Sequence, residues 1–268
     1  MIKSNFHTHT YFCDGKDSPE DMVIAAMAKG FTVLGFSGHG QMPIENDFAM
    51  TAKTEPLYRK EILRLKKKYS GKIKIFCGAE LDYFNVPSDF KYDYIIGSVH
   101  YVFKDGHYIP VDLTADDVVD AVESFYGGDF ESYAEDYYGM ECEVVEKTGA
   151  DIIGHIDLIS KFFEIKAFHY ADRYFHAAEK CVKKLAYYNI PFEINTGAMA
   201  RGYRTDPYPS REILGMIKKY NGKIIISSDC HDKKHLDYAF DKAVNLAVMC
   251  GFSEHGVITE KGIEYIPF

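Results

Sequence analysis

Short apolar runs alternate along the whole chain with longer segments in which apolar residues recur every three or four positions. Each run has the length of a β-strand, and each intervening segment has the spacing of an amphipathic helix. This repeated alternation predicts an α/β protein in which helices cover a parallel sheet. The predicted strands are Ser4–Phe6, Thr32–Phe36, Ile73–Cys77, Tyr94–Ser98, Asp151–Ile153, Pro191–Ile194 and Lys223–Ile226.

The first predicted helix has a defined beginning and end. Ser18 can cap it, Pro19 suits its first turn, and Asp21 takes the place of a capping-box acid. Gly30 is then expected to end it. Three further apolar stripes at helical spacing are assigned to packing between helix and core. They are Tyr133, Tyr137, Met140 and Val144; Phe175, Ala178, Val182 and Leu185; and Leu236, Phe240, Ala243, Ala247 and Cys250, which Gly251 closes.

The alternation fits two architectures, a closed or nearly closed barrel and an open doubly wound sheet. There is no GxGxxG after the first strand and no GxxxxGK[ST] anywhere, so nucleotide-binding open sheets lose their usual signature. Residues 101–130 are expected to form an irregular insertion, and Val257–Phe268 a small hairpin around Glu260, Lys261 and Gly262. Residues 1–268 are expected to fold as a single domain, as barrels of this length often do.

Composition excludes several functional classes. The formal net charge of −9 does not favour broad nucleic-acid binding, which needs a basic face. No run of apolar residues is long enough for a transmembrane helix, and the first residues lack the apolar stretch of a signal peptide. The six cysteines are scattered without a CxxC pair, which argues against a zinc ribbon and a disulfide framework. We therefore expect a cytoplasmic protein with reduced thiols.

Residues with metal-binding side chains recur where the predicted strands end. In a parallel barrel the carboxyl ends of the strands and the loops that follow them form the active site. His7 and His9 follow the first strand two residues apart, so both imidazoles can face one ion. The remaining candidates at strand ends or in the following loop are Asp14, His39, Glu80, His100, His155, Asp229 and His231; the sixth strand ends in Asn195 and Thr196.

A single histidine after a strand is more often a hydrogen-bonded loop residue than a ligand, but here the candidates coincide at one barrel mouth. Zinc prefers about four ligands, so this set is too large for one ion and suggests two or three divalent ions (Zn, Mn or Fe), with Glu80 as the bridge. Water held between two such ions becomes a nucleophile near neutral pH. Cys13 and Cys230 lie beside presumed ligands, where a small neighbouring residue is the simpler interpretation.

At these residues the sequence resembles the PHP family, named for polymerase and histidinol phosphatase. The resemblance spans almost the whole chain and consists of an ordered series of motifs. They are FHTHTYFCDG at the start, FSGHG around His39, GAELDY around Glu80, IIGSVHY around His100, IIGHIDLISKF around His155, EINTG around Asn195 and SSDCHD around Asp229.

The resemblance implies a distorted seven-stranded (β/α)7 barrel, similar to a TIM barrel, that holds up to three metal ions. It implies that His7, His9, Glu80 and Asp229 hold the first ion; Glu80, His100 and His155 the second; and Asp14, His39 and His231 the third. Some members have histidine where this chain has Asp14, so the metal affinity or metal preference of the third site is expected to differ.

Chain length and motif style favour the stand-alone histidinol-phosphatase branch of the family. Members of this branch carry a basic residue shortly after the fifth-strand histidine, and Lys161 stands there. Arg201 and Arg204 follow the sixth strand at the same mouth. Lys161 and one of these arginines are expected to bind a substrate phosphate, with a solvated loop charge as the alternative for Arg204.

The expected reaction is hydrolysis of L-histidinol phosphate by a metal-bridging hydroxide, with Asp229 or, as a weaker candidate, His231 moving the proton. Asp82, Tyr83 and Tyr101 are expected to receive the ammonium and imidazole groups of the substrate. One alternative keeps the metal site but acts on other or many phosphoesters, nucleic acid being disfavoured. A second is a metal-binding module without turnover. The sequence leaves the oligomeric state open.

Overall fold

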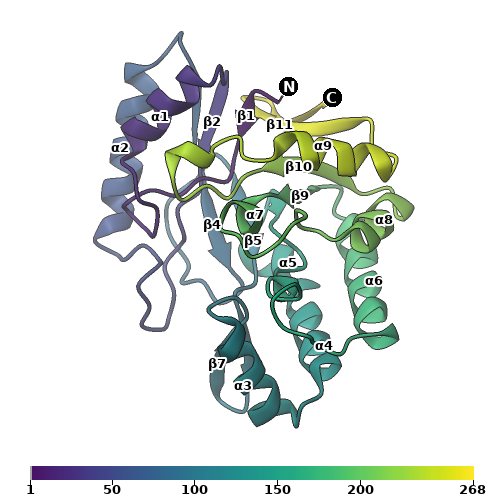
Figure 1. The fold of residues 1–268 in the computed structure, drawn as a ribbon. Helices are drawn as coiled ribbons and strands as arrows, with labels where there is room; N and C mark the ends of the chain where they lie inside the picture. Colours follow the sequence, from purple (N-terminus) through teal and green to yellow (C-terminus); the bar gives the residue numbers. More distant parts are fainter. Residues whose placement is uncertain (1) are drawn as a thin grey trace.

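The computed structural model describes residues 2–268. The protein has a mixed α/β fold in which parallel strands alternate with helices. The first pair of helices, α1 and α2, lies on one side of the strands, and α6 and α8 lie on the other (Figure 1). The two chain ends lie side by side, since Ile2 and Phe268 line one shallow depression. Within the described residues no helix is both long and apolar enough to span a bilayer.

The strands are β1 (Ser4–Asn5), β2 (Val33–Phe36), β3 (Lys74–Cys77), β4 (Ala79–Asp82), β5 (Ile95–Ser98), β6 (Tyr101–Lys104), β7 (His107–Pro110), β8 (Ile152–Ile153), β9 (Pro191–Asn195), β10 (Lys223–Ser227), β11 (Glu254–Thr259) and β12 (Gly262–Pro267). The helices are α1 (Pro19–Ala28), α2 (Thr54–Lys68), α3 (Ala115–Tyr126), α4 (Phe130–Glu141), α5 (Val144–Thr148), α6 (Asp172–Ala186), α7 (Gly197–Ala200), α8 (Arg211–Lys219) and α9 (Phe240–Met249), with short 3-10 turns η1 (Leu158–Ser160) and η2 (Lys233–His235).

All seven strands predicted from the sequence are confirmed, as β1, β2, β3, β5, β8, β9 and β10. They pair in parallel within two sheets, ordered β1-β2-β3 and β12-β11-β10-β9-β8-β5-β4. The predicted C-terminal hairpin is also confirmed, since β11 and β12 pair antiparallel. Single parallel bridges, Thr8 to Cys230 and His39 to Glu80, join the two sheets where regular ladder pairing among residues 2–268 stops.

The third strand is longer than the sequence predicts, and this changes where Glu80 lies. The chain stays extended from β3 through Gly78 into β4, pairing first with β2 and then with β5. Glu80 therefore lies within a strand and not in a loop after one. A side chain at Gly78 would meet the Tyr94 ring at 2.4 Å, so glycine is what allows this close approach.

Tyr94 packs where the two sheets meet. Its ring is buried, and its hydroxyl donates hydrogen bonds to the carbonyl oxygens of Phe6 (2.5 Å) and Phe36 (3.0 Å), at the ends of β1 and β2. The Phe36 carbonyl also accepts a hydrogen bond from the Gly78 amide at 2.8 Å, so the phenol adds a second donor to an oxygen that already joins β2 to the β3–β4 segment. Tyr94 and Gly78 together hold the strands whose ends carry the candidate ligands.

The first helix begins and ends as predicted. The Ser18 side chain accepts a hydrogen bond from the Asp21 amide, and Gly30 follows the helix with a positive φ of 76°. The 172–186 stripe forms one helix, α6, as expected.

Three predictions about elements were wrong. Residues 101–130 are not irregular, because β6 and β7 form a hairpin and α3 follows, capped by Thr114 and ended by Gly127 in the left-handed region. The stripe from Tyr133 to Val144 is split, since α4 ends before Cys142 and α5 begins at Val144. Leu236 is buried as expected, but α9 begins only at Phe240, after Ala239 adopts a positive φ of 55°.

We predict that Gly78→Ala destabilises the fold by about 1–3 kcal/mol, because the added methyl group overlaps the buried Tyr94 ring. Chemical denaturation of the metal-free protein measures the free energy of unfolding. Gly139→Ala in α4 is the matched control, since a side chain there meets nothing within 4 Å and the change should be neutral or stabilising. Equal stability of the two variants would contradict the packing argument.

Candidate metal centre

The nine predicted ligands come together at one end of the strands. His7, His9 and Asp14 follow β1, His39 follows β2, Glu80 lies on β4, and the others follow β5, β8 and β10. Four overlapping groups have ligand atoms within 4.8 Å of one another: His9, Asp14, His39 and His231; His7, His155 and Asp229; His7, His9 and Glu80; and His39, Glu80 and His100.

Glu80 is the centre of this arrangement. Its side chain is 1% exposed, and its two oxygens face five imidazole rings. Oε2 lies 3.0, 3.2 and 3.4 Å from the ring nitrogens of His7, His39 and His9, and Oε1 lies 3.0 and 3.4 Å from those of His155 and His100. Burial alone would raise the pKa of Glu80, but the surrounding imidazoles outweigh it and hold the pKa well below its usual value.

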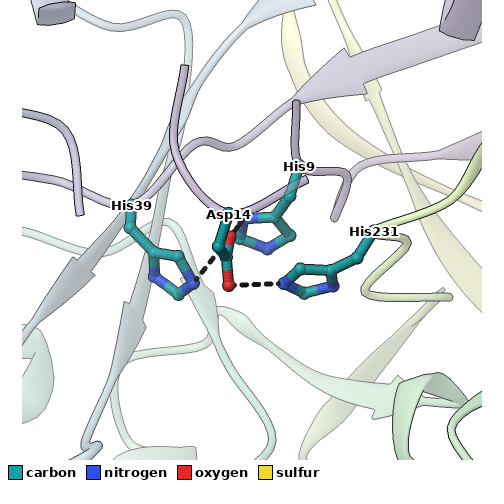
Figure 2. Close-up of side chains that lie close together, drawn as sticks. All are labelled: His9, Asp14, His39 and His231. Carbon is teal, nitrogen blue, oxygen red and sulfur yellow. Dashed lines mark hydrogen bonds and ion pairs between the residues drawn. The ribbon is translucent and has the colours of Figure 1, made fainter. Parts of the chain in front are cut away.

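A second group lies nearer the solvent, around Asp14 (Figure 2). Asp14 Oδ2 is 3.0 Å from His231 Nε2, and Oδ1 is 3.5 Å from His9 Nδ1 and 3.8 Å from His39 Nε2. The rings of His9 and His231 stack at 4.2 Å. Burial, with the neighbouring imidazoles His231 and His39, lowers the pKa of His9 to about 3. His9 is therefore a neutral imidazole, the form that coordinates a metal.

The chemistry of this cluster fits divalent ions. His9 Nε2 is buried without a hydrogen-bond partner among residues 2–268, yet it lies 3.3 Å from Asp229 Oδ1 and 3.4 Å from Glu80 Oε2. A buried nitrogen aimed at two carboxylates in this way has the surroundings of a metal ligand. Imidazole and carboxylate donors suit zinc, manganese and iron.

Asp229 is held in an unusual backbone conformation, with a positive φ of 48° at the second residue after β10. A side chain at residue 197 would come within 2.7 Å of Asp229 Oδ2, so the glycine of the NTG sequence after β9 leaves room for this carboxylate. Arg201 Nη2 donates to Asp229 Oδ2 at 3.0 Å. The same guanidinium lies 3.0 Å from His231 Nδ1, so Arg201 contacts two of the candidate ligands.

Glu193 contacts two candidate ligands and is not among the site residues predicted from the sequence. This fully buried carboxylate on β9 lies 2.7 Å from His7 Nδ1, while its other oxygen accepts hydrogen bonds from the His155 amide (3.1 Å) and from Asn195 (2.9 Å). It thereby fixes the ring of one candidate ligand and the backbone of another. An acid inside the apolar run PFEIN was the available signal.

Asp82 positions His100 much as Glu193 positions His7. The sequence instead predicts that Asp82 receives a charged or polar group of the substrate. Its Oδ2 accepts from the His100 amide at 2.8 Å and lies 3.2 Å from His100 Nδ1. The Tyr83 hydroxyl donates to Glu143, away from the ligands. Of the three residues expected to receive the ammonium and imidazole of a substrate, only Tyr101 lines the cavity described next.

A cavity of about 300 Å³ opens onto the cluster. Phe48 and Tyr101 stack in its wall with ring centroids 6.3 Å apart. Lys161 and Arg201 also line it, whereas Arg204 lies in a separate cavity, where it donates to Ser160 and covers the Tyr208 ring. The full lining is Asp14, His39, Asp47, Phe48, Glu80, His100, Tyr101, Pro110, Asp112, Leu113, His155, Leu158, Lys161, Arg201, Asp229 and His231.

The two cysteines beside the ligands have neutral thiols. Burial raises the pKa of Cys13 and of Cys230 to about 12. Cys230 Sγ donates to the carbonyl of Asp232, and Cys13 Sγ lies 3.5 Å from His9 Nδ1. Neither thiol provides a thiolate nucleophile, which supports the interpretation of both as small neighbouring residues.

We predict that Glu193→Gln lowers metal affinity roughly 10- to 100-fold, because the amide cannot hold the His7 ring as the carboxylate does. Titration of the metal-free protein with Zn or Mn, followed by elemental analysis of the bound ions, measures the change. Glu179→Gln is the control, since that carboxylate pairs with Lys219 on the surface. Unchanged affinity in Glu193→Gln would contradict the positioning role.

The chain is similar to known proteins over most of its length. The histidinol-phosphatase of Bacillus subtilis is 24% identical over 90% of this chain and 98% of its own length. The histidinol-phosphatase of Lactococcus lactis is 27% identical over 95% and 93%.

Two solved structures share the fold. The HisK protein of Listeria monocytogenes has a TM-score of 0.77 at 20% identity and covers 89% of this chain and 99% of its own. Histidinol phosphate phosphatase of L. lactis, solved with zinc, L-histidinol and phosphate, has a TM-score of 0.73 at 23% identity and covers 98% of both. The model of the PHP domain matches residues 5–197, so the chain belongs to the PHP family.

Proposed function

We propose that this protein is a metal-dependent phosphomonoesterase that hydrolyses L-histidinol phosphate to L-histidinol and phosphate. The observation that carries the proposal is the convergence of nine candidate ligands around the buried Glu80 carboxylate, at the floor of a cavity that also holds Lys161 and Arg201. The relatives named histidinol-phosphatase support the substrate, since they match over nine-tenths or more of both lengths.

Two or three ions of Zn, Mn or Fe are proposed as cofactors, with the ligands His7, His9, Asp14, His39, Glu80, His100, His155, Asp229 and His231. When bound, the ions would neutralise phosphate oxygens and lower the pKa of a coordinated water. Glu80 is the proposed bridge because each of its two oxygens faces a different set of imidazoles. Lys161 and Arg201 would bind and orient the phosphate at the open side of the cluster.

The proposed proton carriers are Asp229 and His231. Asp229 lies between His9 and Arg201, and His231 is 20% exposed at the wall of the cavity, where a leaving alcohol can reach it. Arg201 touches both and would keep their positions fixed. Arg204 would act at most indirectly, through its bond to Ser160 beside Lys161.

We also propose that the fold is a single-domain barrel. The bridges Thr8 to Cys230 and His39 to Glu80 support the two sheets as parts of one distorted seven-stranded (β/α)7 barrel and residues 1–268 as a single domain. Six free cysteines favour a reducing compartment, the cytoplasm.

We predict that the purified protein loaded with Mn or Zn releases phosphate from L-histidinol phosphate with a higher kcat/KM than from other phosphomonoesters. The measurement is phosphate release across a panel that includes glycerol phosphate, a nucleoside monophosphate and phosphotyrosine, with a short DNA oligomer as a nuclease control. A flat profile would contradict this substrate assignment and favour a PHP phosphatase with a broad or different substrate range. An absence of turnover with every ester would favour a metal-binding module.

We predict that Lys161→Met raises KM and the Ki for inorganic phosphate roughly 10- to 100-fold, because a charge-assisted contact to the phosphate is lost. The metals should remain, since Lys161 is not among the candidate ligands. Steady-state kinetics and metal analysis measure both effects. Lys166→Met is the control, because that lysine pairs with the exposed Asp116. A fall in metal content with unchanged KM would contradict the assignment.

A further inference from the structure

The ammonium of Lys161 already has a partner in this structure. Its Nζ donates to Asp112 twice, to the backbone oxygen at 2.6 Å and to Oδ2 at 3.0 Å. Lys161 is 6% exposed and follows η1, whereas Asp112 follows β7, so the pair joins two loops that are distant in sequence. Both side chains line the cavity over the metal centre.

A phosphate that takes Lys161 as its counter-ion must therefore displace Asp112 or share the ammonium with it. A carboxylate left without a cation in a partly enclosed site is unfavourable, since breaking such a pair is much more costly than exchanging it. A substrate whose only charged group is its phosphate leaves the Asp112 carboxylate without a cation. A substrate that also carries an ammonium provides a new partner for it.

The remaining wall of the cavity suits the same kind of molecule. Asp47 is a second carboxylate, and Phe48 and Tyr101 form a stacked aromatic pair. One cavity thus offers cations for a phosphate, carboxylates for a cation and ring faces for a planar group. The Lys161 and Asp112 charges are adjacent, so the two opposite charges of the ligand must also be close together, as on neighbouring carbon atoms.

We propose that substrate binding exchanges the ion pair between Lys161 and Asp112 for two pairs with the substrate, phosphate with Lys161 and ammonium with Asp112. Asp112 is then the residue that selects phosphomonoesters with an ammonium on the carbon next to the esterified one. The inference rests on the proposed function, because L-histidinol phosphate has this arrangement, and it adds the residue that recognises it.

The test compares L-histidinol phosphate with its deaminated analogue, imidazolylpropyl phosphate, which keeps the ring and the phosphate. The wild-type protein should prefer the ammonium ester roughly 10- to 100-fold in kcat/KM, the effect of one charge-assisted contact. Asp112→Asn should bring the two values within about threefold of each other, by lowering only the value for the ammonium ester. A merely structural role would lower both together and leave the ratio unchanged.

Asp116→Asn is the matched control, since this exposed aspartate lies on the same segment and pairs with Lys166; its ratio should equal that of the wild type. Asp112→Glu keeps the charge and should retain most of the preference. If Asp112→Asn keeps the wild-type ratio, the exchange is overturned while the proposed function stands. If the wild type turns over neither ester, it is the proposed function that fails.

A measurement on the wild-type protein covers the case in which Asp112→Asn does not fold. L-histidinol should strengthen binding of inorganic phosphate about tenfold or more in a calorimetric titration, whereas imidazolylpropanol should not, because only the amino alcohol gives Asp112 a new partner. Equal effects of the two alcohols would overturn the exchange.

Discussion

The structure depends on one buried carboxylate that faces five imidazole rings. Glu80 is only 1% exposed, so its charge is tolerable only because the surrounding residues stabilise it. Those imidazoles come from segments that follow β1, β2, β5 and β8, and each segment must therefore end at the same height as β4. The register of the strands is in this sense fixed by the chemistry at their ends as well as by the apolar contacts beneath them.

This constraint explains why so much of the arrangement could be predicted from the sequence. Parallel strands bring their carboxyl ends to one edge, so a histidine or acid after each apolar run predicts convergence without any knowledge of side-chain geometry. His7, His39, His100 and His155 all obey that rule. The PHP motifs then distinguish this centre from scattered loop histidines, because the order of the motifs follows the order of the strands.

What the sequence did not predict has a common physical cause. Glu193 and Asp82 lie inside strands, where an acid in an apolar run has no visible partner until the neighbouring strand is in place. The extension of β3 into β4 depends on the Tyr94 ring, which is distant in sequence from Gly78. The hairpin of β6 and β7 has little alternation of apolar and polar residues, because its exposed face carries Phe103 and Tyr108 while Val102 and Ile109 are buried, so the sequence predicts irregular chain there. The sequence leaves the role of Arg204 open, and the structure places this side chain in a separate cavity, since position in a loop near the site does not determine the direction of a side chain.

The two tasks of the site are carried by different parts of the molecule. The candidate metal ligands lie on or directly after strands, and Glu193 and Asp82 hold the rings of His7 and His100 from within the sheet. The groups proposed to face a substrate, by contrast, line the cavity from loops and from the hairpin segment: Asp47, Phe48, Tyr101, Asp112 and Lys161. None of the residues in the second set is a candidate metal ligand. Asp112 and Lys161 neutralise each other across two loops. In the proposed exchange their charges separate only when a ligand brings both an ammonium and a phosphate. Recognition of the alcohol is thereby coupled to recognition of the phosphate.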